Sequence, residues 1–153
     1  MLPIRADHVR LFLHIVAACV WIGGQVVLAG LVPVLRRVDT DDRRATRAVA
    51  RQFQRLAWPA FAVLLATGIW NLVDVHASEQ STQWLVTLFV KLVLVAVAGV
   101  GAGLHALLTG PAVTRATDPA DLRRRQAMSG GLAGVGLLAA LGAAFLGVQL
   151  TLH

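Results

Sequence analysis

The sequence predicts an all-α membrane protein, a bundle of four transmembrane helices that forms one domain over residues 1–153. Three observations lead to this fold class. Hydrophobic residues make up 57% of the chain and charged residues only 14%, the mean hydropathy is +0.69, and four long apolar segments alternate with short polar ones. A water-soluble domain of this size cannot bury so much apolar surface, so the expected solvent is the lipid bilayer.

Each apolar segment is long enough to cross a membrane as a helix. The segments cover about residues 11–35, 56–73, 84–108 and 129–152. About 20 helical residues, at a rise of about 1.5 Å each, span the roughly 30 Å of hydrocarbon. Because lipid offers no hydrogen bonds, each backbone segment must pair its own amides, and helices are therefore expected.

The distribution of arginine predicts the orientation of the bundle. Eleven of the thirteen arginines lie in residues 36–55 and 115–125, whereas residues 74–83 contain no Lys or Arg. The positive-inside rule therefore places the two Arg-rich loops in the cytoplasm and both termini outside. We expect a multi-pass protein of the inner (plasma) membrane, and we assign the net charge of +6 to topology rather than to nucleic-acid binding.

Two further features concern the helices themselves. Turn-forming and acidic residues at 39–42 predict that the second helix begins near residue 41, as an amphipathic extension outside the membrane. Small residues at Gly99 and Gly103, and again at Gly130 and Gly134, have the spacing that lets helices approach closely. Such pairs suit packing within the bundle, a homo-oligomer, or a larger membrane partner.

Ionisable residues inside the spans are the main evidence on function. His14, the only lysine Lys91, and His105 lie within apolar segments. Such residues are costly in lipid and usually face the interior of a bundle or a cavity. Trp21 and Gln25 follow His14 by seven and eleven residues, so they share its helical face, and that face is expected to point inward.

The depths of these residues predict a site in the outer half of the bundle. Lys91 follows Trp84 by seven residues, which places it about 10 Å below the outer boundary, close to the depth of His14. Two more polar residues lie toward this outer end of the bundle: Asn71, near the end of the second span, and His76, in the loop that follows. His105 lies some 20–25 Å deeper than His14, and we interpret it as a satisfied interfacial histidine.

Two occupants of this site are compatible with its residues. His14 together with His76 provides imidazole ligands for copper, whereas Cys19 lies about 140° around the helix from His14 and cannot join them. Alternatively, His14 is an axial ligand of haem b, beside glycines and aromatic residues, and Lys91 pairs with a propionate or supplies the second ligand. No residues indicate a catalytic mechanism, so enzymatic activity stays open.

Several motifs resemble the copper resistance D (CopD) family. The run from Leu13 to Gly24, LHIVAACVWIGG, resembles the first span of that family. Residues 53–57 and 66–71 resemble its second span, and Trp84 with Lys91 and Leu92 resembles the third. The resemblance extends over roughly residues 9–110, and the last span is similar only as an apolar helix. It implies a role in copper homeostasis or transport across the inner membrane.

The HemJ-type protoporphyrinogen oxidases have a similar layout, with a histidine in the first span and a lysine in the third. This resemblance implies that His14 and Lys91 would serve haem and catalysis. The family usually has a histidine closer behind the lysine than His105 is. We therefore rank copper handling first, a b-type haem protein second, and a small accessory subunit of a membrane complex third.

Overall fold

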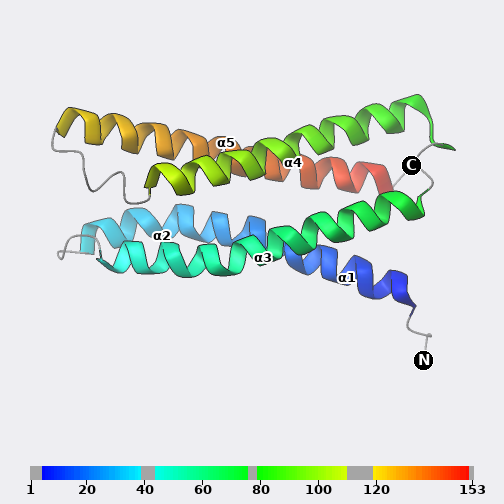
Figure 1. Ribbon diagram of the computed structural model, residues 1–153, viewed down its shortest axis with the longest axis horizontal. Coiled ribbons are helices and arrows are strands. Elements are labelled where there is room, and N and C mark those ends of the chain that lie inside the picture. The colour runs from blue at the N-terminus through cyan, green and yellow to red at the C-terminus, as the bar shows by residue number, and fades with distance from the viewer. Residues whose placement is uncertain (1–4, 39–43, 76–78, 110–118, 152–153) are drawn as a thin grey trace. The chain divides into compact units, whose positions relative to one another are not determined.

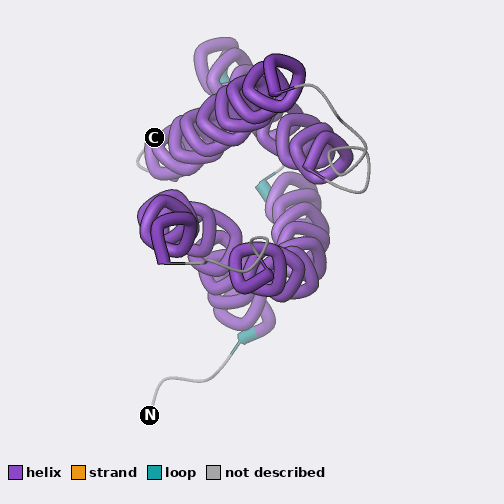
Figure 2. Tube along the Cα trace, turned by 90° about the vertical axis from the view of Figure 1, so that its left-hand side faces the viewer, coloured by secondary structure: helices purple, strands orange, loops and turns teal. Residues whose placement is uncertain are grey.

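The computed structural model describes residues 5–38, 44–75, 79–109 and 119–151. Its elements, in chain order, are α1 (Ala6–Ala18), the π-helical turn η1 (Cys19–Gly23), α2 (Gly24–Val38), α3 (Arg44–Asp74), α4 (Thr82–Thr109) and α5 (Pro119–Thr151) (Figure 1). No strand occurs in the described part of the chain (Figure 2). The predicted all-α fold is therefore confirmed.

Four helices are long and apolar enough to cross a membrane, as predicted. They cover Ala6–Leu35, Arg44–Asp74, Thr82–Leu107 and Ala127–Thr151. In their most apolar windows only 11–22% of the residues are buried, and large side chains such as Phe12, at 64% relative exposure, face outward. Apolar surface of this extent is expected against lipid and not against water.

Several helices extend beyond the predicted spans. Helix α3 already runs from Arg44, twelve residues before the predicted span starts at Leu56. This agrees with the predicted extension outside the membrane, although the predicted start near residue 41 lies outside the described residues. Helix α5 likewise begins at Pro119, ten residues before Ser129.

The chain divides into two compact units, which we describe separately. Unit 1 covers Met1–Gln80 and packs the continuous helix α1–η1–α2 against α3. Unit 2 covers Ser81–His153 and packs α4 against α5. The predicted single bundle over residues 1–153 stays a prediction.

Unit 1 is centred on aromatic side chains around the π-helical turn. Trp21, which is only 3% exposed, lies in this turn, and its ring centroid is 4.4 Å from Phe61 and 5.9 Å from Trp58. A Cβ added at Gly24 would overlap the ring of Phe53, so only glycine allows α2 to approach α3 here. The π-helical turn and Gly24 thus allow the first helix to pack against aromatic side chains of α3.

Unit 2 is held together by small residues. A Cβ at Gly136 would lie 3.6 Å from the carbonyl oxygen of Ala98, and one at Gly101 would lie 3.5 Å from that of Leu132. The predicted pair Gly130 and Gly134 has no neighbouring atom within 4 Å of either Cβ position in the described part of the chain. Gly101 and Gly136 therefore lie at the contact of α4 and α5, whereas the predicted pair Gly130 and Gly134 does not, and the predicted pair Gly99 and Gly103 stays a prediction.

The packing of unit 2 predicts that two nearby glycines of α5 differ in their effect on stability when they are replaced by leucine. We expect Gly136→Leu to lower the unfolding free energy by about 1–3 kcal/mol, because the added side chain has no space beside Ala98. We expect no loss for Gly134→Leu, whose side chain would enter open space. Unfolding in mixed micelles with a rising fraction of SDS measures both values. Equal losses would contradict the interface described for α4 and α5.

The orientation of the termini is a prediction from the arginine distribution alone. Alkaline phosphatase needs disulfide bonds and is active only outside the cytoplasm. A fusion after the C-terminus is therefore expected to be active, and a fusion within residues 115–125 is expected to be inactive. The reverse pattern would overturn the predicted outer location of His14.

Candidate functional site

His14 is held between α1 and α3 by a hydrogen bond. Its Nδ1 lies 2.8 Å from Oγ1 of Thr67, and Thr67 is only 7% exposed. The adjacent ring carbon, Cε1, lies 3.4 Å from the position that a Cβ of Gly68 would occupy. The absence of a side chain at Gly68 therefore lets the imidazole lie against the backbone of α3.

The partners of Thr67 determine which nitrogen of His14 carries the proton. The Thr67 hydroxyl has one proton and donates it to the carbonyl oxygens of Val63, at 2.7 Å, and Leu64, at 3.2 Å. With its proton directed to these carbonyl oxygens, the hydroxyl accepts from His14, which corresponds to the tautomer with the hydrogen on Nδ1. A histidine held in this way through one nitrogen is the usual arrangement of a metal ligand.

An ion pair joins the same two helices one turn further along. Arg10, whose side chain is 11% exposed, pairs with Asp74 of α3 and lies 3.6 Å from Asp7 of its own helix. Its guanidinium carbon is 5.7 Å from the ring centre of Trp70. This cluster was not predicted, although Arg10 precedes His14 by four residues and Asp74 follows Thr67 by seven, which are helical spacings.

The remaining predicted residues of unit 1 have other surroundings. The amide of Gln25 donates to the Trp21 carbonyl oxygen at 3.1 Å, within its own helix, and Trp21 is part of the aromatic core. Half-buried Asn71 lies one turn beyond Thr67 on α3. His76 lies outside the described residues. The structure thus brings His14 together with Thr67 and Gly68, not with Gln25.

Lys91 lies in unit 2, at the α4–α5 contact. Its Nζ is 3.2 Å from the position that a Cβ of Gly147 would occupy, so this glycine makes room for the ammonium group. No hydrogen bond or ion pair within the described ranges involves Lys91. Because Lys91 and His14 belong to different units, the site that they were expected to share stays a prediction.

His105 has the hydrogen bonds expected of an interfacial histidine. Its Nδ1 lies 2.9 Å from both the carbonyl oxygen and the hydroxyl of Ser129, which is 6% exposed. A carbonyl only accepts, so Nδ1 carries the proton here as well. The interpretation of His105 as a satisfied histidine is confirmed.

A metal centre with several protein ligands is absent from the described segments. In the described segments, no group of three or more His, Cys, Asp or Glu residues lies close enough together to hold an ion. Cys19 is exposed, in agreement with the predicted separation of its face from that of His14. The candidate site is therefore built on His14, with Thr67, Gly68 and the Arg10–Asp74 pair around it.

The fold and this site define a four-span helical membrane protein with an inward-facing histidine held by a hydroxyl. A family model described as Copper resistance protein D matches residues 47–148. The chain therefore belongs to the copper resistance protein D (CopD) family, and its membership agrees with the predicted location in the inner membrane. No curated protein and no solved structure matches the chain.

The family model matches a different part of the chain from the part over which the motifs predicted a resemblance. The match begins within α3 and includes most of the last span, which was expected to be similar only as an apolar helix. The first span, with His14, lies outside it. Thr67, Lys91 and His105 lie inside it.

The role of Thr67 in fixing the ring of His14 can be tested by substitution. Thr67→Val keeps the shape of the side chain but removes the acceptor for Nδ1–H, and we expect a loss of about 1–3 kcal/mol in unfolding free energy. Thr67→Ser keeps the hydroxyl and is expected to restore most of it. Nitrogen NMR of the histidine ring should give a single Nδ1–H tautomer in the native protein and a mixture in Thr67→Val. An unchanged tautomer in Thr67→Val would contradict the assignment.

Proposed function

We propose that this protein binds copper within the membrane and carries it across, with Nε2 of His14 as a ligand. The observation that supports this is the hydrogen bond between His14 and Thr67, which uses Nδ1 of the ring, so that Nε2 is the nitrogen we propose as the ligand. Membership of the copper resistance family supports the choice of metal. Imidazole is a good ligand for copper in a protein.

The surroundings of His14 favour an ion over a macrocycle. The ring lies with Cε1 against the backbone of α3 at Gly68. A copper ion needs space only for itself and a second ligand beside the ring nitrogen, whereas haem b requires a wide flat space beside the iron ligand. Copper therefore fits the contact between α1 and α3 better than haem does.

The ion pair at the end of the two helices supports the same site. Arg10 lies one turn from His14 on α1 and Asp74 lies two turns from Thr67 on α3, so their ion pair holds the register in which the hydrogen bond forms. A transported ion must also leave its site, which favours few ligands over a closed cage. His76 stays the predicted second ligand, and Lys91 stays a proposed partner for an anionic group in unit 2.

Copper binding can be tested with variants at matched histidines. We expect the purified protein, loaded with Cu(I) under reducing conditions, to hold about one ion per chain on the His14 imidazole. His14→Asn keeps an amide that can donate to Thr67 but lacks the Nε2 lone pair, and we expect it to lose the copper. His105→Asn, in unit 2, removes an equally hydrogen-bonded histidine and should retain the copper. Metal analysis after desalting provides the measurement.

The same preparation separates the alternative functions. Equal copper in the native protein and in His14→Asn would contradict the proposed ligand. A Soret band that disappears in His14→Asn would indicate a haem protein instead. A preparation with neither metal nor haem, but with a second membrane protein in constant ratio, would indicate an accessory subunit. Copper uptake by proteoliposomes then tests transport.

A further inference from the structure

A row of arginines runs along one face of the first half of α3. Arg44, Arg47, Arg51 and Arg55 follow each other at spacings of three, four and four residues. At 3.6 residues per turn these positions fall within an arc of about 80°. All four side chains are exposed, and no salt bridge within the described part of the chain includes any of them.

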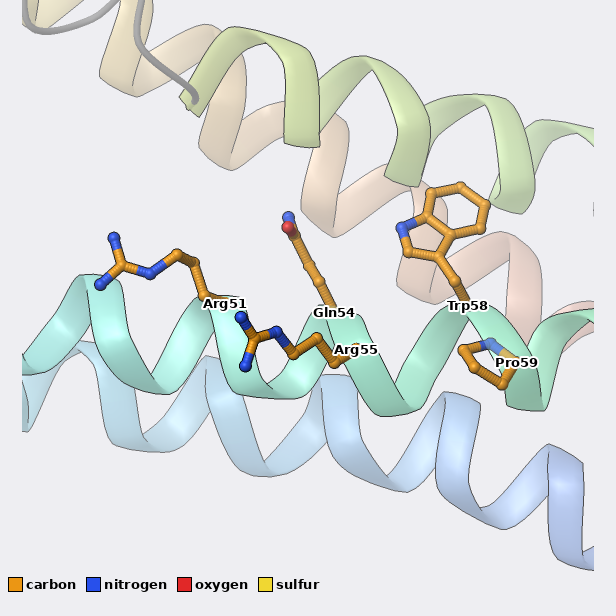
Figure 3. A pocket seen from close by; sticks show the side chains of 5 residues that line it. All are labelled: Arg51, Gln54, Arg55, Trp58 and Pro59. Carbon is orange, nitrogen blue, oxygen red and sulfur yellow. The ribbon is translucent and has the colours of Figure 1, made fainter.

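The row continues into polar and aromatic side chains at its inner end. Arg51, Gln54, Arg55, Trp58 and Pro59 line a shallow depression on this face. Figure 3 shows Arg51, Gln54 and Trp58 projecting from the same side of the helix, with the indole nitrogen on the side of Gln54. Two arginines, an amide and an indole therefore follow one another along the depression.

The sequence of α3 places this depression at the membrane surface. Residues 56–73 contain no charged residue, and Arg55 directly precedes them. The 31 residues of α3 extend over about 46 Å, more than the roughly 30 Å of hydrocarbon. Arg51 and Arg55 thus lie at the level of the lipid headgroups, and Trp58 lies one turn deeper, where indoles are favoured.

Two features fix the geometry of the depression. The ring of Trp58 packs at 5.9 Å from Trp21 and 6.1 Å from Phe61, so its orientation is set by the aromatic core. Pro59 has no N–H to donate to the carbonyl oxygen of Arg55, which leaves that oxygen without its helical donor. Donors for an anion therefore lie beside an acceptor that suits a hydroxyl group.

We propose that Arg51, Gln54, Arg55 and Trp58 bind the phosphate of an anionic phospholipid headgroup. Guanidinium forks bind phosphate through paired, charge-assisted hydrogen bonds, and the amide and the indole add further donors. The depression lies directly before residues 56–73, which contain no charged residue. This position beside the hydrocarbon favours a lipid headgroup over free phosphate. The proposal does not depend on copper.

The experiment compares two pairs of arginines on the same helix. The protein is purified, returned to nanodiscs of phosphatidylcholine with a rising fraction of phosphatidylglycerol, and retained lipids are counted by native mass spectrometry. Arg51→Lys with Arg55→Lys keeps the charge but removes the bidentate forks, and we expect phosphatidylglycerol binding to weaken about five-fold or more. Arg44→Lys with Arg47→Lys makes the same change farther from the membrane and is expected to have no effect.

Replacement by glutamine provides a second comparison. Arg51→Gln with Arg55→Gln should weaken binding about twenty-fold or more, because each arginine near a membrane surface contributes about five-fold. Arg44 lies seven residues from Arg51 and eleven from Arg55, about 10 and 16 Å along the axis and so at or beyond the screening length of about 10 Å, and Arg44→Gln alone should therefore change binding less than about two-fold. Trp58→Phe keeps the ring and tests the N–H donor alone, and weaker binding is expected.

Each possible result decides for or against the proposal. Equal weakening by the two lysine pairs, or none by either, would show a diffuse attraction of charges and overturn the headgroup site. Displacement of phosphatidylglycerol by millimolar inorganic phosphate would identify a site for the free anion and overturn the lipid assignment. Circular dichroism and thermal unfolding of every variant exclude a loss of fold as the cause.

Discussion

The structure depends on one constraint, which is that a polar group inside a bilayer has no water to bind. Each unit meets it by pairing a side chain on one helix with a group on the other. His14 bonds to Thr67 in unit 1, and His105 bonds to Ser129 in unit 2, in both cases through Nδ1. The indole of Trp84 likewise donates to the Leu150 carbonyl oxygen at 3.4 Å. These bonds set the register of each helix pair, because a rotation would leave a polar group in lipid.

Much of the fold followed from hydropathy alone, because a span must be long and apolar whatever it packs against. The helical period also predicted that His14 faces inward. The helical period does not hold from His14 as far as Gln25. The π-helical turn at Cys19–Gly23 inserts an extra residue and changes the helical position of every later residue. The spacing of apolar residues does not predict a π-helical turn at this position.

It was harder to predict which residues contact each other across two helices than to predict which face of a helix points inward. Arg10 and Asp74 each stand at a helical spacing from a predicted residue, but their pairing depends on which ends of α1 and α3 meet. The same holds for Gly101 and Gly136, which lie at the α4–α5 contact, whereas Gly130 and Gly134 have no neighbour there. A pattern of small residues predicts that helices approach closely, and only the register decides which glycines touch.

The extent of the family match bears on how the site is built. The matched segment, residues 47–148, contains Thr67 and Asp74 on α3, whereas their partners His14 and Arg10 lie before it. Helix α3 therefore carries the two groups that bond to side chains of the first helix, a hydroxyl and a carboxylate that lie seven residues apart. A first helix satisfies both only if it places a donor against each of them, about 10 Å apart along the axis. The register imposed by these two contacts, more than the composition of α1, holds the imidazole of His14 against Thr67.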